Sequence, residues 1–391
     1  MIYFDNGATT FPKPRAVVNA VDRTMRYYGA NPGRSGHNMS LKASEIMYDC
    51  RKNAANLFNA DSPEKIIFTY NCTAALNYVI KGILKEGDHA VISSLEHNAV
   101  LRPLENMKEN GVEYSIADYS PDDEETINNF RNSIRPNTRL VICTHASNVF
   151  GVRLPVERIA ALCRIHGILF CVDAAQTAGV VPISLKDSCI DFLCTAGHKG
   201  LYGPMGTGIL AINSETLPES LIQGGTGSFS SDRKQPAILP DRYESGTPNL
   251  PGIAGLNEGI KFVMKRTERG IERYESDLAV RLYHKLKNIS GVVLYTDSPE
   301  THRCVPVISF NIEGLDSEET AEILDKRFNI AVRAGLHCAP LAHEFFGTQE
   351  SGTVRAVLSV FSNCEQVDYF ASSIRTINKF KKELKKVAID I

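Results

Sequence analysis

The sequence predicts an α/β protein with a mostly parallel central sheet, helices on both faces of that sheet, and a smaller α+β domain at the carboxyl end. Apolar, strand-like runs alternate with helical patterns from about residue 60 to residue 210, which is typical of βαβ units. Two of these runs, 168–172 and 192–194, are continuously apolar, as in strands that are covered on both faces. Polar residues follow directly after them, at the sheet edge where such folds bind ligands.

The chain of 391 residues is long enough for two domains. We expect a large domain over residues 15–255. The N-terminal arm, 1–14, is expected to join residues 256–391 in a small domain.

The composition argues against several classes of function. A net charge of −2 creates no field that favours nucleic acid or an anionic membrane, and no apolar run reaches the length of a membrane span. Asp5 interrupts the N-terminus early, so we expect no signal peptide and a cytoplasmic protein. The ten cysteines are scattered and form no CxxC pair, which favours free thiols over disulfides or a zinc site.

Local patterns predict the elements up to residue 172. Residues 29–37, GANPGRSGH, are too rich in glycine, proline and asparagine for regular structure, and an acidic stretch at 121–126 begins a helix. The expected strands are 2–4, 66–69, 88–93, 112–117, 139–144 and 168–172, and the expected helices are 15–28, 40–58, one that ends at 84, and 155–166.

The later part of the chain begins with a long irregular connection, 223–249. Structureless segments of this length are usually functional or lie at an interface. The expected elements that follow are a helix over 256–289, a strand over 305–311, a helix over 317–328 capped by Ser317, a strand over 353–361 and a helix over 365–387.

Lys199 is the first candidate catalytic residue. It follows the apolar strand 192–194 in the segment DFLCTAGHKGLYGPMGTG, and four glycines follow it within nine residues. A lysine held in a partly desolvated pocket loses its proton more easily and becomes a nucleophile toward carbonyl groups. A solvated loop lysine is the alternative.

Asp173 is the second candidate, at the carboxyl end of strand 168–172 in GILFCVDAAQ. An aspartate there can cap a helix, bind a metal or pair with a protonated ring nitrogen. Pyridoxal phosphate (PLP) requires such a ring partner together with a lysine. Asp173 and Lys199 follow two consecutive strands and match this pair.

Several motifs together carry a family resemblance: FDNGATT at 4–10, VDAAQ at 172–176, GHKGLYGPMGTG at 197–208, and RAGLHCAP at 333–340. The chain resembles the class V aminotransferase group of fold-type I PLP enzymes, and within it the cysteine desulfurases and selenocysteine lyases. The resemblance implies a homodimer that converts L-cysteine to L-alanine and passes the sulfur to Cys338 as a persulfide. It also implies a sulfur-acceptor protein, whose identity stays open, and selenocysteine as a second candidate substrate.

The resemblance assigns roles to cofactor-binding residues. Lys199 holds PLP covalently and then acts as a base, Asp173 keeps the ring nitrogen protonated, and His97 stacks on the ring and moves protons. The other cofactor contacts that it implies are Thr73 and Ala74 at the phosphate, Asn148 and Gln176 near the phenolic oxygen, Thr195, His198, and Thr247, which reaches the phosphate of the neighbouring subunit.

Two positions depart from the family pattern. Ala74 stands where relatives often have an acidic residue. Ala196 replaces a serine that helps to bind the phosphate, and we expect Thr195 or Thr247 to compensate. Simple helix capping by Asn71 or Thr73 is the alternative to a phosphate site at this helix start.

Cys338 is the second reactive centre. It lies between Gly335 and Pro340 beside His337, a setting that favours an exposed thiol with a lowered pKa. A metal site that combines Cys338, His337 and His343 is the alternative, but no matching ligand pair follows elsewhere.

Arg355 lies in a strand-like run, and its planar guanidinium fits a carboxylate in two parallel bonds. The resemblance assigns it to the substrate α-carboxylate, and it assigns further substrate contacts to Asn148, His37 and Arg34. An internal salt bridge is the alternative for Arg355.

Two other functions are alternatives. Another class V aminotransferase, lyase or epimerase would need Lys199 but would have no use for Cys338. A dinucleotide-binding oxidoreductase would need GxGxxG after the first strand and an acidic residue about twenty positions later. Neither TYNCTAALN nor GPMGTG fits that context.

Overall fold

The computed structural model describes residues 1–33, 36–296, 298–299 and 303–388. The chain forms two compact units. The large unit comprises Lys13–His145 and Leu154–Glu268, and the small unit comprises Met1–Pro12, Ala146–Arg153 and Arg269–Ile391.

The units differ from the expected domain boundaries at the long helix. The expected helix over 256–289 is two helices, α7 (Leu250–Arg266) and α8 (Glu268–Lys287), which are separated by Thr267 with a φ of 61°. Helix α7 packs on α1 (Arg15–Tyr27) and α2 (Asn38–Leu57), so it belongs to the large unit.

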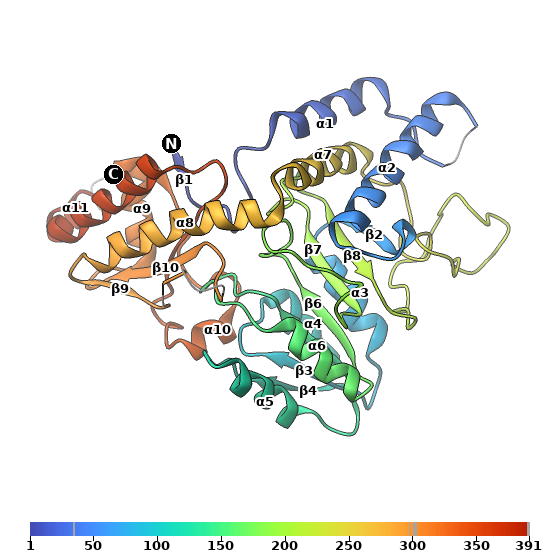
Figure 1. Ribbon diagram of the computed structural model, residues 1–391, viewed down its shortest axis with the longest axis horizontal. Helices are drawn as coiled ribbons and strands as arrows, with labels where there is room; N and C mark the ends of the chain where they lie inside the picture. Colours follow the sequence, from blue (N-terminus) through green and yellow to red (C-terminus); the bar gives the residue numbers. More distant parts are fainter. Residues whose placement is uncertain (34–35, 297, 300–302, 389–391) are drawn as a thin grey trace. The chain divides into compact units, whose positions relative to one another are not determined.

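A seven-stranded sheet forms the centre of the large unit, which confirms the predicted α/β class (Figure 1). The strand order is β2-β8-β7-β6-β5-β3-β4. Among these seven strands, β8 is the one that runs in the opposite direction, antiparallel to both β2 and β7. The sequence patterns did not predict this strand. The strands are β2 (Ile66–Thr69), β3 (His89–Ser93), β4 (Glu113–Ala117), β5 (Thr138–Thr144), β6 (Leu169–Asp173), β7 (Phe192–Ala196) and β8 (Gly208–Ile212).

Four helices connect and cover these strands. Helix α3 packs on α4 and on the strands β7 and β8, whereas α5 packs on α6 and on β4. The helices are α3 (Cys72–Ile83), α4 (Asn98–Lys108), α5 (Asp123–Ser133) and α6 (Val156–Ile165), and a short 3-10 helix, η1 (Pro63–Lys65), precedes β2. The parallel connections bring the carboxyl ends of β3, β5, β6 and β7 to one edge of the sheet.

The small unit contains an antiparallel sheet of order β12-β10-β9 and a parallel pair of β1 with β11. Its core includes Phe4, Phe310 and Phe370, whose rings meet edge to face. The strands are β1 (Ile2–Tyr3), β9 (Val292–Leu294), β10 (Val307–Ile312), β11 (Ile330–Ala331) and β12 (Val354–Val357), and the helices besides α8 are α9 (Ser317–Phe328), α10 (Pro340–Phe345) and α11 (Cys364–Ala388).

The cap of α9 corrects one expectation. The N-cap residue is Asp316 rather than Ser317. The Asp316 carboxylate accepts from the backbone N–H groups of Glu318 and Glu319, and the Glu319 side chain accepts in return from the Asp316 N–H. An ionised carboxylate satisfies these free donors and also interacts favourably with the helix dipole.

In the part of the chain that the structure describes, no helix combines the length and apolar character needed to cross a membrane. Within the same residues, no three histidine, cysteine or acidic side chains gather as they would around a metal ion.

Glu96 joins the ends of two strands in the large unit. Its side chain is completely buried. Oε1 accepts from the Ser93 hydroxyl at the end of β3 and from the Thr144 backbone N–H at the end of β5, the latter at 2.7 Å. Oε2 is buried and has no hydrogen-bond partner among the described residues. Burial, which outweighs these hydrogen bonds, raises the pKa of Glu96 from 4.5 to about 8.

This raised pKa predicts how stability depends on pH. Between about pH 4.5 and pH 8 the folded state holds a proton on Glu96 that the unfolded state has lost, so the free energy of unfolding should fall as the pH rises through this window. Glu96→Gln keeps the acceptor oxygen and cannot ionise, and should therefore flatten the pH dependence of urea unfolding midpoints. Glu105→Gln, at an exposed position of α4, is the control and should not flatten it. Parallel curves for the wild type and Glu96→Gln would contradict a buried neutral acid.

Candidate active site

Lys199 lies in a tight turn after β7. Its side chain is half-buried, and its carbonyl accepts the Tyr202 N–H at 2.8 Å. The glycines around it are required by close packing: a Cβ on Gly200 would lie 2.4 Å from the Ala178 carbonyl oxygen, and a Cβ on Gly197 would lie 2.2 Å from Thr207 Oγ1. The glycine-rich sequence therefore lets two loops approach closely at the lysine.

Lys13 supports this turn from the other end of the sequence. Its Nζ donates to the His198 carbonyl at 2.7 Å, next to Lys199. Burial lowers the pKa of Lys13 to about 8. Burial, followed by the charges of Lys199 and Lys13, lowers the pKa of His198 to about 4, so the His198 ring is neutral at pH 7. No local pattern marked Lys13 as part of the site.

Asp173 ends β6, and the structure brings it to the same sheet edge as the Lys199 turn. The carboxylate is 5% exposed, and Oδ1 accepts from the Ala175 N–H at 2.9 Å and the Cys72 thiol at 3.3 Å. Burial and the charge of Asp173 raise the pKa of Cys72 well above its usual value, so this thiol stays protonated as a donor. No local pattern in the sequence indicates this pair, because its members are 101 residues apart.

His97 follows β3 and caps α4. Its Nδ1 accepts the Ala99 N–H at 3.0 Å, which requires a neutral ring with its hydrogen on Nε2. The cap fixes the orientation of the ring through Nδ1. Gln176 is half-buried in the turn after β6, three residues beyond Asp173.

Asn71 caps the start of α3, which is one of the two caps named as the alternative to a phosphate site. The Asn71 side chain accepts the Ala74 N–H at 2.9 Å, so this N–H is engaged within the helix. Thr73 is exposed at the first turn.

Thr195 is completely buried in β7, and its hydroxyl donates to the Ala174 carbonyl at 3.4 Å. The Thr195 hydroxyl is thus engaged within the protein, and its expected compensation for Ala196 stays a prediction.

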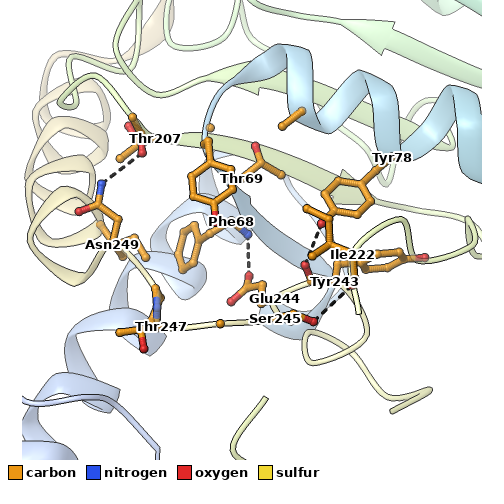
Figure 2. A pocket seen from close by; sticks show the side chains of 17 residues that line it. Phe68, Thr69, Tyr78, Thr207, Ile222, Tyr243, Glu244, Ser245, Thr247 and Asn249 are labelled. Carbon is orange, nitrogen blue, oxygen red and sulfur yellow. Dashed lines mark hydrogen bonds between the residues drawn. The ribbon is translucent and has the colours of Figure 1, made fainter. Parts of the chain in front are cut away.

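Thr247 is exposed and lines a pocket in the large unit (Figure 2). Ala74, Tyr70 and Thr207 of the same chain line this pocket as well. The long segment 223–249 thus passes close to the start of α3 within one subunit.

A buried ion pair holds the Thr247 segment against the edge strand β2. Glu244 receives two bonds from the Arg51 guanidinium. It also accepts the Phe68 backbone N–H at 2.6 Å, the bond drawn between these two residues in Figure 2. The guanidinium also lies over the Phe68 ring, 4.4 Å from its centroid. Arg51 and Glu244 are 193 residues apart, so no local pattern in the sequence could reveal this pair.

His37 is exposed and caps α2, where its Nδ1 accepts the Ser40 N–H at 3.2 Å. Arg34, the other residue expected in this loop, lies outside the described residues.

Arg355 is almost fully buried in β12 of the small unit, with 1% of its surface exposed. Nη2 pairs with the Asp5 carboxylate at 3.0 Å, and Nη1 donates to the Asn148 carbonyl at 2.7 Å. The internal salt bridge weighed for this arginine is therefore present. Its Nε–H is buried and has no partner among the described residues, so this donor is not used within the protein.

The N-terminal motif Asp5-Asn6-Gly7 packs around this arginine. Asp5 supplies the counter-ion, and Asn6 fixes the turn by donating to the Val357 carbonyl at 2.9 Å. A Cβ on Gly7 would lie 2.9 Å from Val357 and 3.2 Å from the Arg355 guanidinium carbon, so only glycine fits over the arginine.

Cys338 is exposed, as expected, in a turn that begins at Leu336. The Arg333 guanidinium lies 3.9 Å from its sulfur. The expected role of His337 is not supported. Its side chain is 3% exposed, and burial, together with the charge of Arg355, lowers its pKa to about 3. A neutral imidazole brings no charge to the neighbouring thiol, whereas the Arg333 guanidinium is a cation near the sulfur.

The backbone of this turn is unusual. His337 and Cys338 have φ angles of 48° and 59°, and the Ala339 N–H donates to the Leu336 carbonyl at 3.0 Å. Positive φ at both central positions defines a type I′ turn, which normally uses Asn-Gly. Non-glycine residues in this region each cost about 1–3 kcal/mol, so the surrounding contacts must hold the turn in place.

Comparison with known proteins places the chain in a family. The aminotransferase class-V family model matches residues 2–370. A probable cysteine desulfurase of Methanothermobacter thermautotrophicus is 31% identical over 96% of this chain and 94% of its own, and one of Pyrococcus abyssi is 33% identical over 97% and 94%.

Solved structures agree with this assignment. A cysteine desulfurase from Thermococcus onnurineus is 35% identical with a TM-score of 0.89, and one from Escherichia coli is 25% identical with a TM-score of 0.86. Each match covers 97% of this chain and 94% of the other. The chain therefore belongs to the aminotransferase class-V family, and within it to the group of the cysteine desulfurases.

Proposed function

We propose that this protein is a PLP-dependent cysteine desulfurase that converts L-cysteine to L-alanine and transfers the sulfur to Cys338 as a persulfide. The observation that carries the proposal is the exposed Cys338 thiol beside Arg333, on a turn that Asn148 ties to the buried Arg355. The names of the relatives support the same activity.

The donor groups of the large unit fit PLP. Asp173 offers a buried carboxylate for a protonated ring nitrogen, and Lys199 offers a half-buried amine at the same sheet edge. The neutral His97 ring matches the partner that the family stacks on the cofactor. Bound PLP supplies an electron sink for the α-carbon of an amino acid substrate.

Each residue then has a defined task. Lys199 holds the cofactor and afterwards takes the α-proton with its free amine. Asp173 keeps the ring nitrogen protonated, and the Cys72 and Ala175 donors hold its carboxylate in position. His97 moves a proton through Nε2. Gln176 and Asn148 are proposed at the phenolic oxygen, as in the family, and His198 at the lysine turn.

The phosphate is proposed to bind at the exposed start of α3, near Thr73 and Ala74. The helix dipole and the first-turn N–H groups favour an anion there. Because Asn71 engages the Ala74 N–H, contact at Ala74 requires this cap to yield.

Arg355 is proposed to recognise the α-carboxylate of the substrate. Asp5 and the Asn148 carbonyl fix the guanidinium, which leaves the Nε–H as a donor for the carboxylate. The exposed His37 is proposed as a further substrate contact, together with Arg34.

The sulfur transfer balances with Cys338 as the nucleophile. Its thiolate attacks the substrate sulfur, so that an S–S bond forms while the C–S bond breaks. The electron pair of the C–S bond returns to the substrate carbon, which takes a proton to give alanine. The Arg333 guanidinium lies beside this sulfur. L-Selenocysteine fits the same scheme, and a sulfur-acceptor protein would then remove the persulfide sulfur in the cytoplasm.

We further propose a homodimer in which Thr247 reaches the phosphate of the partner subunit. Mixing Lys199→Ala chains with Thr247→Ala chains at limiting PLP should then restore activity, because one site of each hybrid dimer has both residues intact. Random exchange should restore up to about a quarter of the wild-type rate. If the chains exchange without restoring activity, Thr247 serves its own subunit, as the shared pocket with Ala74 would permit.

Cys338→Ala separates a desulfurase from other class V reactions. The variant should retain its PLP content, and borohydride should still attach the cofactor to the peptide that contains Lys199, because Cys338 does not hold the cofactor. Alanine release from L-cysteine should fall by at least about a hundredfold, with no persulfide on the protein.

Cys364→Ala is the matched control, because Cys364 is the other exposed cysteine. It should leave the rate unchanged. Wild-type turnover of cysteine by Cys338→Ala would replace the persulfide mechanism with that of a lyase or an aminotransferase. If the purified wild-type protein contained no PLP, the proposal of a PLP-dependent enzyme would be wrong.

A further inference from the structure

His337 is the residue of the Cys338 turn whose expected role the structure does not support. The ring is buried in the small unit, and Nε2 lies 3.0 Å from the Thr353 carbonyl oxygen and 3.3 Å from the Thr353 hydroxyl. A carbonyl only accepts, so Nε2 must carry the hydrogen. The ring also stacks on His343, with centroids 5.8 Å apart and planes 23° apart. The side chain therefore anchors the turn to Thr353, the residue that directly precedes the strand β12.

Asn148 holds the same residue by its backbone. Its Nδ2 donates to the His337 carbonyl at 2.8 Å, while its own carbonyl accepts from Arg355. The turn is thus fixed at His337 from two sides, by the ring and by the peptide carbonyl. Gly352 makes room for the approach, since a Cβ there would lie 2.8 Å from the Gly335 Cα.

We propose that His337 is a positioning residue that holds the Cys338 turn in its left-handed conformation, and that it takes no part in proton transfer. The inference rests on the proposed role of Cys338. The anchor compensates for positive φ at two consecutive non-glycine residues and keeps the neighbouring thiol exposed beside Arg333. The groups around the ring favour a neutral imidazole. The positive charges of Arg355 and Arg333 oppose a second positive charge on His337, and the stacked His343 is buried and supplies no negative charge.

Two substitutions distinguish an anchor from an acid–base group. His337→Gln places an amide nitrogen where Nε2 lies and can still donate to the Thr353 carbonyl, but it cannot titrate. His337→Ala removes both properties. If His337 is an anchor, the His337→Gln variant should keep the conformation of the turn, and the His337→Ala variant should not. If His337 transfers protons, both variants should lose activity equally.

The test uses the holoenzyme and three readouts. Hydrogen exchange in the peptide 336–345 reports the Ala339 amide that closes the turn. The iodoacetamide reaction of Cys338, relative to that of Cys364 in the same chain, reports the position of the thiol. These two readouts need neither substrate nor turnover, so they remain valid even if the proposed desulfurase activity fails. The third readout is kcat and KM for L-cysteine.

In His337→Ala, exchange should rise by at least about tenfold and the alkylation ratio should change by at least about threefold, while kcat falls about tenfold and KM changes less than about threefold. His337→Gln should stay within about threefold of the wild type in all three. Wild-type behaviour of His337→Ala would overturn the proposal, as would equal loss of activity in both variants with exchange protection intact.

If His337→Ala does not fold, the wild type and His337→Gln still decide the question. The pH profile of Cys338 alkylation should be the same in both and show only the thiol. An extra inflection between about pH 5 and pH 8 in the wild type that disappears in His337→Gln would overturn the proposal, because it would show an imidazole that titrates.

Discussion

The geometry of the large unit depends on one constraint, the meeting of the carboxyl ends of four parallel strands at one sheet edge. In this register Thr144 at the end of β5 lies beside Asp173 at the end of β6, and Cys194 in β7 lies on its other side. The turns that carry Lys199 and His97 begin at the same edge. Glu96 bonds across the ends of β3 and β5, so the edge is fixed by a side chain as well as by the sheet.

Buried titratable groups held in their neutral form are a second common feature. Burial keeps Glu96 protonated near neutral pH and keeps the His198 and His337 rings uncharged. Some buried charges in each unit stay paired instead: Arg355 pairs with Asp5 in the small unit, and Arg51 pairs with Glu244 in the large unit.

The sequence predicted what local patterns encode and missed what depends on distant contacts. The α/β class and the placement of Asp173 and Lys199 after consecutive strands followed from apolar runs and glycine-rich turns, and they are confirmed in position. Lys13 contacts the His198 carbonyl across 185 residues, and Asp5 pairs with Arg355 across 350. Such pairs leave no local signal. His337 was misjudged because adjacency in sequence does not show whether a ring faces its neighbour or the core.

The stoichiometry of products tests the central claim most directly. The purified protein, incubated with L-cysteine and dithiothreitol, should release alanine and sulfide in equal amounts over many turnovers, because each C–S bond that breaks yields one of each. Pyruvate and ammonia in place of alanine would indicate a lyase, and 3-mercaptopyruvate without sulfide would indicate transamination. Either result would contradict the account of this protein as a cysteine desulfurase.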